Sequence, residues 1–338
     1  MYFITGATGF LGGHIVCQML IDKKELVALK RPSSSLKQLE IIADYYTSIG
    51  YEIDLNKVQW LQGDLFDEEI IKDTLTKVKT VIHSAGVVSF HPKDAHLLYE
   101  VNVEATKNLI NYALECGLDY FLHVSSVSTL GAKSHMEINE SSMFYEEGKG
   151  HYAKSKYLGE VEVHRASAEG LRVGIINPSL IIGAGDWSSG TAHFFKLFGG
   201  KFPFYGIGST GFVTATDVAK AVLWMVNERS TEQFLLSEDN YPFKKIFDVI
   251  AEQLGTKKPQ IPITIRRAEW AWRLFAVREA ITGKRSYFSA ENARSAVQDR
   301  KFDGQKILKQ ANSFTYTPVL KEVEKMCTYY KTVQIEND

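Results

Sequence analysis

The sequence predicts an α/β protein built on a Rossmann-type, doubly wound parallel sheet, with a smaller, mostly helical C-terminal substrate region. The first observation is an alternation of short apolar runs with helical segments, typical of a parallel sheet covered by helices. The second is a glycine-rich turn between the first apolar run and the first helix. The third is a set of small and polar residues at the carboxyl ends of later runs. The expected strands are 2–5, 26–29, 58–62, 80–83 and 120–124.

The composition is that of an ordinary globular chain. Of 338 residues, 45% are hydrophobic and 23% are charged, and 39 basic residues against 40 acidic ones give a net charge of −1. This balance argues against a nucleic-acid-binding protein, which usually carries a basic excess. No apolar run approaches the ~20 residues of a membrane-spanning helix, and no secretory leader precedes the first strand. We therefore expect a cytoplasmic protein without a membrane span.

Cysteine usage points to a reducing compartment. Cys17, Cys116 and Cys327 lie far apart and show no paired spacing for a metal site. A sparse, odd number of cysteines also argues against a disulfide framework. We expect no metal site.

The glycine-rich turn indicates a bound dinucleotide. Gly6, Gly9 and Gly12 follow the strand 2–5 directly and precede a helical run that reaches Ile21. Glycines here let the backbone turn tightly, approach a pyrophosphate and pack the helix on the strand. The helix N-terminus then offers free N–H groups to the phosphates. The spacing is G-x-x-G-x-x-G, and although a flexible turn is the simpler alternative, the strand–turn–helix context favours the cofactor site.

The end of the second strand bears on which cofactor is bound. Lys30 and Arg31 stand where a site for the unphosphorylated dinucleotide usually has an acidic residue, about 20 residues past the glycines. A guanidinium suits a bidentate grip on a 2′-phosphate. We therefore expect NADP(H), with Arg31 favoured over Lys30 and with NAD still possible. The alternative is a solvated basic loop.

Later strand ends add candidates for the same crevice. Asp64, at the end of strand 58–62, could accept from an adenine amino group or cap the following helix, for which Asp67 is better placed. Small residues at 84–86 leave room for a ribose. Asn102 lies on a long helix expected over 93–117.

Tyr152 and Lys156 are the candidates for proton chemistry. Four residues apart on a helix, their side chains share one face. A nearby ammonium favours the phenolate and lowers the pKa of the phenol, and the charge of an oxidised nicotinamide would add to this effect. Taken alone, the pair would be interpreted as an ordinary exposed helical pair, because this spacing occurs by chance in many proteins.

Six motifs in order make the chain resemble the extended short-chain dehydrogenase/reductase superfamily, also called the NAD-dependent epimerase/dehydratase family. The resemblance covers about the first 220 residues. Within the superfamily the chain is most similar to the dihydroflavonol-4-reductase-like branch, through residues 83–86, Lys30-Arg31 and 177–183. The motifs are Thr5-Gly6-x-x-Gly9-x-x-Gly12, Gly63-Asp64-Leu65, Asn102-Val103-x-Ala105-Thr106, Val124-Ser125-Ser126, Tyr152-x-x-x-Lys156 and Asn177-Pro178-Ser179.

The resemblance implies roles for individual residues. Ser126 would polarise the substrate carbonyl, Tyr152 would act as general acid/base, and Lys156 would hold the nicotinamide ribose and lower the pKa of Tyr152. The cofactor-binding residues that it implies, together with those inferred above, are Gly6, Thr8, Gly9, Phe10, Leu11, Gly12, Lys30, Arg31, Asp64, Leu65, Ser84, Ala85, Gly86, Asn102, Ser125, Tyr152, Lys156 and Pro178.

The implied function is an NADP(H)-dependent oxidoreductase that interconverts a carbonyl and an alcohol on a small, hydrophobic substrate. Dehydratases of sugar nucleotides usually have acidic residues after the catalytic hydroxyl, whereas Val127 and Ser128 stand here. An NAD-dependent sugar-nucleotide epimerase remains an alternative. A non-catalytic dinucleotide sensor is a further alternative.

The second half is expected to determine the substrate. We predict a dinucleotide-binding domain over 1–178 and a substrate region over 179–338, from which 212–240 returns to the first domain. Aromatic residues between 193 and 205 could line a hydrophobic pocket or seal the joint between domains. Asp217 is expected to cap a helix.

Two surfaces carry expectations of their own. The stretch 266–275 is basic, amphipathic and rich in tryptophan, so it could lie on a membrane surface. We expect instead that it packs against the protein's own core. The resemblance also implies a homodimer formed through helices 93–117 and 151–169.

Overall fold

The computed structural model describes residues 1–131, 136–146, 149–200, 202–282 and 290–337. Among these residues, seven parallel strands form the central sheet in the order β10-β6-β5-β4-β1-β2-β3. The order reverses between β1 and β4, where open α/β sheets bind ligands at their carboxyl ends. The predicted fold class is therefore confirmed. The strands are β1 (Tyr2–Thr5), β2 (Leu26–Lys30), β3 (Gln59–Gln62), β4 (Thr80–His83), β5 (Tyr120–Val124), β6 (Val173–Pro178) and β10 (Gln233–Leu236).

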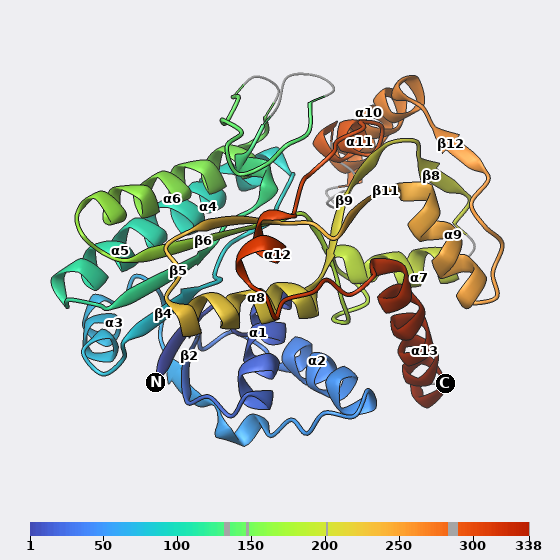
Figure 1. Cartoon of the computed structure of the whole chain (residues 1–338). Helices are drawn as coiled ribbons and strands as arrows, with labels where there is room; N and C mark the ends of the chain where they lie inside the picture. The colour runs from blue at the N-terminus through green and yellow to red at the C-terminus, as the bar shows by residue number, and fades with distance from the viewer. Residues whose placement is uncertain (132–135, 147–148, 201, 283–289, 338) are drawn as a thin grey trace.

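Helices cover both faces of this sheet (Figure 1). Successive side chains of one strand serve opposite layers, since Phe3 packs with α3, α5 and α6 while Ile4 packs with α1, α2 and α8. Burial on both faces is why the inner strands read as apolar runs, whereas the edge strand β3 is exposed at Gln59 and Gln62. The helices are α1 (Phe10–Ile21), α2 (Lys37–Ser48) and α8 (Ala215–Glu228) on one face, and α3 (Glu68–Leu75), α4 (Ala95–Tyr99), α5 (Ala105–Glu115) and α6 (His151–Ala168) on the other.

The C-terminal region mixes helices with two small sheets. One sheet has the order β11-β9-β7, and the other pairs β12 with β8. Its strands are β7 (Leu180–Ile182), β8 (Phe204–Gly206), β9 (Ser209–Thr214), β11 (Asp239–Pro242) and β12 (Ile261–Ile263). Its helices are α7 (His193–Gly199), α9 (Phe243–Gln253), α10 (Ile265–Thr282), α11 (Ala290–Ser295), α12 (Lys306–Gln310) and α13 (Val319–Asn337).

The start of α8 differs from the expectation. Thr214, not Asp217, is the N-cap, and its hydroxyl accepts from the Asp217 N–H at 3.0 Å. The buried Asp217 carboxylate accepts instead from the Thr317 N–H at 2.6 Å and from its hydroxyl at 2.9 Å. Asp217 therefore ties the segment before α13 to α8.

The aromatic residues of α7 pack into the protein interior and do not line an open pocket. Phe195 and Phe198 are buried. The Phe198 ring stacks on Phe247 of α9 at 4.0 Å between centroids, and Phe194 meets the same ring edge-on at 5.1 Å. These rings therefore pack α7 on α9 within the C-terminal region, which is neither of the two predicted arrangements.

The tryptophan-rich helix α10 does not pack as expected. Ala268 is buried, but Trp270 and Leu274 are among the most exposed apolar side chains of the chain. The expectation of a stripe covered by the protein's own core is therefore wrong for these residues. No helix in the described ranges is long and apolar enough to cross a membrane.

Candidate active site

The glycine turn between β1 and α1 is shaped by close backbone contacts. Gly6 has φ +74°, and a Cβ there would lie 2.6 Å from the Ala85 nitrogen. A Cβ on Gly12 would collide with the Gly6 carbonyl oxygen. Gly9 is the N-cap of α1, and the partly exposed Thr8, Phe10 and Leu11 border the turn. Backbone brought this close, beside a helix N-terminus without an acidic residue in its first turn, fits a dinucleotide pyrophosphate.

The end of β2 places its two cations differently. The Lys30 ammonium lies over the Trp60 ring, 5.9 Å from its centroid. Arg31 is exposed just beyond the strand. The Lys30 carbonyl accepts from the Gly63 N–H at 3.1 Å, which ties this strand end to that of β3. The preference for Arg31 over Lys30 at a 2′-phosphate stays a prediction.

Asp64 lies in a turn at the end of β3, followed by the buried Leu65. Its carboxylate accepts from the Phe66 N–H at 3.2 Å. Asp67 is the N-cap of α3, as expected, but its carboxylate accepts from the Asp64 N–H at 2.6 Å and makes no cap hydrogen bond to the helix.

Asn102 supports the segment that follows β4. The helix predicted over 93–117 is divided, and Asn102 lies in a π-helical segment, Glu100–Glu104, between α4 and α5. Its amide donates to the Val87 carbonyl and to the Ser155 hydroxyl, both at 3.0 Å, and accepts from the Val87 N–H at 2.8 Å. Both amide hydrogens are thereby used within the protein. Asn102 holds residues 84–87, where Ser84, Ala85 and Gly86 lie, against α6.

Ser126, Tyr152 and Lys156 come together beside the end of β5. Ser126 caps the 3-10 turn Val127–Thr129, where its hydroxyl accepts from the Ser128 N–H at 3.1 Å. The Ser126 side chain lies near enough to Tyr152 to act on the pKa of its phenol. Lys156 is buried one helical turn after Tyr152, and its ammonium donates to the Val124 carbonyl at 2.8 Å. The geometry fits a hydroxyl pair beside a buried cation.

The pKa of Tyr152 departs from the expectation. Burial raises it, the neighbouring Ser126 hydroxyl opposes this shift, and the Glu291 carboxylate raises the pKa further. The predicted lowering by Lys156 is therefore not what the protein groups alone produce. Burial also lowers the pKa of Lys156 to about 8, against the opposing effect of Glu160. Desolvation outweighs the charge–charge effects at both residues.

A buried hydrogen-bond network around Glu160 was not anticipated from the sequence. Its carboxylate accepts from Ser125, from the Thr129 hydroxyl at 3.0 Å and from the Asn177 amide at 2.8 Å. Gln233 donates to it at 3.1 Å. Burial raises the pKa of Glu160, but His164, 3.8 Å away, and the hydrogen bonds from Ser125, Asn177 and Thr129 outweigh burial and lower it. Glu160 lies four residues after Lys156 on α6, and this helical spacing could have indicated that the two charges are neighbours.

This Glu160 network, defined as Ser125, Thr129, Glu160, Asn177 and Gln233, fixes the backbone of Ser126. The Ser126 carbonyl accepts from the Thr129 N–H at 3.1 Å and from the Asn177 amide at 3.2 Å. Pro178 follows Asn177 at the buried end of β6. The network therefore acts on Ser126 through its main chain.

A second charged group was also missed. The Glu291 carboxylate of α11 lies against Gly150, where a Cβ would collide with it. Lys149 donates to the Ser128 carbonyl at 3.0 Å and to the Leu130 carbonyl at 3.2 Å. The charge of Glu291 raises the pKa values of Lys149 and Arg300, as it does that of Tyr152. We call Lys149, Glu291 and Arg300 the Glu291 cluster.

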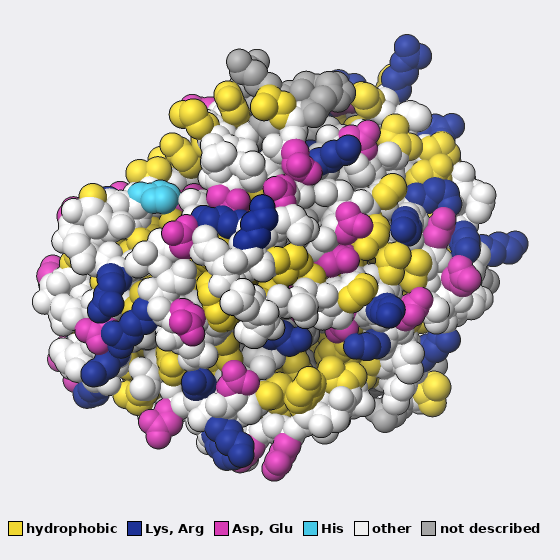
Figure 2. Space-filling view, in the orientation of Figure 1, with side chains coloured by type: hydrophobic (Ala, Val, Ile, Leu, Met, Phe, Trp, Pro, Cys, Tyr) yellow, Lys and Arg dark blue, Asp and Glu magenta, His cyan; other side chains and the backbone are white. Residues whose placement is uncertain are grey.

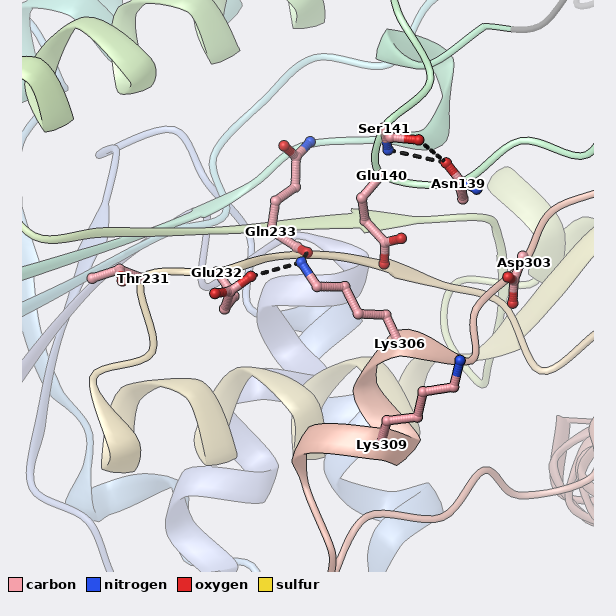
Figure 3. A pocket seen from close by; sticks show the side chains of 9 residues that line it. All are labelled: Asn139, Glu140, Ser141, Thr231, Glu232, Gln233, Asp303, Lys306 and Lys309. Atoms are coloured by element: carbon pink, nitrogen blue, oxygen red, sulfur yellow. Dashed lines mark hydrogen bonds and ion pairs between the residues drawn. The ribbon is translucent and has the colours of Figure 1, made fainter.

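A polar pocket of about 550 Å³ lies elsewhere (Figure 3). Its residues come from the segment before α6, the start of β10 and the region of α12, and they include the ion pair between Lys306 and Glu232 at 2.7 Å. None of the predicted site residues lines it. Gln233 connects its wall to the Glu160 network. Within the described ranges, no group of three His, Cys, Asp or Glu residues is placed to hold a metal ion.

Comparisons with known proteins agree with the geometry. A family model described as "Male sterility protein" matches residues 4–227. Sterol demethylase protein B of Methylococcus capsulatus is 28% identical over 268 residues, which are 78% of this chain and 77% of the relative. A Synechocystis protein whose name refers to dihydroflavonol 4-reductase is 30% identical over 187 residues, 55% of this chain and 50% of the relative. Mouse 3 beta-hydroxysteroid dehydrogenase type 7 is 28% identical over 198 residues, 55% and 51% of the two chains.

The chain thus spans about half the length of the last two relatives. Solved structures show the same fold over the whole chain. The structure of gox2253 has a TM-score of 0.79 at 23% identity and covers 98% of both chains. UDP-glucose 4-epimerase from Thermotoga maritima has a TM-score of 0.76 at 14% identity and covers 98% of this chain and 99% of its own.

Proposed function

Because the chain belongs to the male sterility family of NAD-binding proteins, within the extended short-chain dehydrogenase/reductase superfamily, we propose that this NAD(P)-dependent oxidoreductase interconverts a carbonyl and an alcohol on a small hydrophobic substrate. The family expected from the motifs is confirmed. The observation that carries the proposal is the proximity of Ser126 to Tyr152, close enough to act on its pKa, with Lys156 buried one turn further along α6.

Each residue of the pair has a task that follows from its chemistry. Tyr152 donates a proton to the substrate oxygen during reduction and takes it back during oxidation, which is general acid–base catalysis. Ser126 donates a hydrogen bond to the same oxygen and polarises the carbonyl. The nicotinamide, when bound, supplies or accepts the hydride. Lys156, held at the Val124 carbonyl, has further N–H donors with which to hold a ribose hydroxyl.

The residues around the glycine turn would hold the dinucleotide. The backbone between Gly6 and Gly12 and the first N–H groups of α1 suit the pyrophosphate. Arg31, exposed at the end of β2, suits a 2′-phosphate, so NADP(H) is the proposed cofactor. Asp64 stands at the next strand end for the adenine.

A hydrophobic substrate is supported by the surroundings of Tyr152 and by the relatives. The Phe90 ring meets the Tyr152 ring edge-on at 5.5 Å. The names of the three curated relatives refer to sterol, dihydroflavonol and hydroxysteroid chemistry. A flat, lipophilic ketone or its alcohol is the substrate class that these observations share.

The test is the oxidation of NADPH by the purified full chain with a panel of aryl ketones, steroid ketones and aldehydes. We expect Tyr152→Phe to lower kcat by about 10²–10⁴-fold, because the proton donor is lost. Tyr157→Phe is the matched control, since Tyr157 lies on the same helix and stacks on Phe144 at 4.1 Å. Full turnover by Tyr152→Phe would overturn the mechanism.

The released cofactor distinguishes the remaining alternatives. An NADP(H) oxidoreductase exchanges its cofactor with each turnover. Tightly retained NAD, identified by mass spectrometry, together with conversion of a sugar nucleotide, would replace the proposal with an epimerase. Tight cofactor binding without turnover on any substrate of the panel would indicate a sensor.

A further inference from the structure

Helix α10 presents a continuous apolar stripe to solvent. Trp270, Leu274, Val277 and Ile281 are 76%, 72%, 56% and 79% exposed. Their spacing of four, three and four residues places them along one line of the helix, within about 60° of each other at ~100° per residue. Exposed apolar side chains are ordinary when scattered singly, but a contiguous set marks a surface for interaction.

The opposite side of α10 is held against the protein by several contacts, and the apolar stripe therefore faces solvent. Ala268 is buried. The Glu279 carboxylate, largely buried, bonds the His91 ring nitrogen at 3.0 Å and the Lys93 ammonium at 2.9 Å. Glu269 accepts from the Trp272 indole at 3.1 Å and pairs with Arg294 of α11 at 3.7 Å. These contacts fix the rotation of the helix about its own axis.

The charges of α10 are divided between its two sides. Its glutamates, Glu269 and Glu279, belong to the anchored side described above. Arginines flank the apolar stripe, with one row on each side of it at the same helical spacing. They are Arg266 and Arg273 on one side, and Arg267 and Arg278 on the other. Arg273 also pairs with Glu269 at 3.1 Å, and Arg267 donates to the Pro262 carbonyl at 2.8 Å. An apolar line with cationic borders complements a surface that is apolar inside and anionic outside.

A second segment extends this surface. Met136 and Met143, between β5 and α6, are both strongly exposed. Figure 1 places the loops between β5 and α6 along the same upper edge of the molecule as α10. Figure 2 shows hydrophobic side chains gathered along this edge, with Lys and Arg side chains beside them at its right-hand end. His91, which bonds Glu279 of α10, directly follows Phe90, whose ring meets that of Tyr152, so α10 lies near the candidate active site.

We propose that α10 docks the protein on the surface of a bilayer that contains anionic lipids. The four apolar side chains enter the boundary between headgroups and acyl chains, and the flanking arginines contact the headgroup phosphates. A second copy of the chain is a poorer occupant, because stripe-to-stripe packing would bring rows of arginines against equal charge. If the proposed function holds, the docked enzyme draws its lipophilic substrate from the membrane.

The test is co-sedimentation of the full-length protein with phosphatidylcholine vesicles, with and without phosphatidylglycerol. We expect binding to the anionic vesicles, and at least a tenfold loss of partitioning in the double variant Trp270→Ser/Leu274→Ser. Both sites are exposed, so the variant should melt at the wild-type temperature. Ile335→Ser is the matched control, because Ile335 on α13 is 77% exposed far from α10, and it should bind like the wild type.

A second set of variants separates the contribution of the arginines from that of the apolar stripe. Removing two arginines in Arg266→Gln/Arg278→Gln should weaken binding to anionic vesicles by roughly fivefold per charge at low salt. Binding to pure phosphatidylcholine should change little. The assay involves no turnover, so its outcome is independent of the carbonyl–alcohol activity.

Two outcomes would overturn the proposal. One is equal sedimentation of the wild type and the double serine variant with anionic vesicles. The other is an absence of vesicle binding while the same variant lowers the sedimentation coefficient of the free protein, which would make the stripe an interface between copies of this chain.

Discussion

The Glu160 network and the Glu291 cluster both lie close to the Ser126–Tyr152 pair, but they satisfy their charges in different ways. Glu160 is buried, and several neighbouring side chains donate to its carboxylate. In the Glu291 cluster, burial pushes each group towards its neutral form. It raises the pKa of Glu291, lowers that of Lys149 to about 8, and lowers that of Arg300.

This difference separates two functions of charge near a reacting group. A network whose donors serve one carboxylate and a neighbouring carbonyl fixes the backbone, here that of Ser126, and its charge is neutralised locally. The charges of the Glu291 cluster are not neutralised in this way, and in a low-dielectric environment they act on neighbouring groups. Glu291 does so on Tyr152. The first group should therefore control stability and position, and the second should control the proton.

The largest effect is expected when the Glu160 network is broken. Glu160→Leu removes the acceptor for several buried donors, and each unsatisfied group costs about 1–3 kcal/mol. We expect the free energy of unfolding to fall by about 2–5 kcal/mol and kcat to fall by roughly tenfold or more, because Ser126 shifts. Urea denaturation and steady-state kinetics measure the two effects.

Two variants bracket this result. Glu160→Gln keeps the shape and one acceptor oxygen, so it should recover part of both losses. Glu169→Leu, at the exposed end of α6 where Glu169 pairs with Arg165, should cost less than about 1 kcal/mol. If Glu160→Leu unfolded at the wild-type urea concentration, the network would not be what holds Ser126.

A smaller effect is expected at an exposed charge on the cofactor side. Arg31→Ala should raise the KM for NADPH by about 10–100-fold and leave that for NADH nearly unchanged, because a bidentate contact to the 2′-phosphate is lost. Lys30→Ala is the control, since Lys30 lies over Trp60. Equal increases for both cofactors in Arg31→Ala would place Arg31 outside the phosphate site.

The sequence predicted those parts of the molecule that depend on local signals. Strands buried on both faces read as apolar runs, and the glycine turn and the Tyr152–Lys156 spacing are short patterns that survive folding unchanged. Glu291 escaped notice because only tertiary structure brings α11 to the start of α6. The exposure of Trp270 escaped for a related reason, since periodicity defines a face of a helix but not whether another element covers it.

The pKa of Tyr152 shows the same limit, and it yields the subtlest prediction. The Glu291 carboxylate raises that pKa, so Glu291→Gln should lower it. Oxidation of the alcohol needs the deprotonated phenol as base, so the rise of kcat/KM with pH should move to lower pH in the variant. A set of kcat/KM values for alcohol oxidation across pH measures this.

The control for this prediction is Glu269→Gln on α10, which removes an equal charge that the structure pairs with Arg273 and Arg294. Its profile should match the wild type. An unchanged profile in Glu291→Gln, with normal kcat, would show that the charge of Glu291 does not reach Tyr152 when substrate is bound. The Glu160 network and the Glu291 cluster would then differ only in how they pack and not in their effect on Tyr152. If the pH profile shifts in Glu291→Gln but not in Glu269→Gln, the Glu291 cluster controls the pKa of Tyr152. The Glu160 network then controls only the position of Ser126.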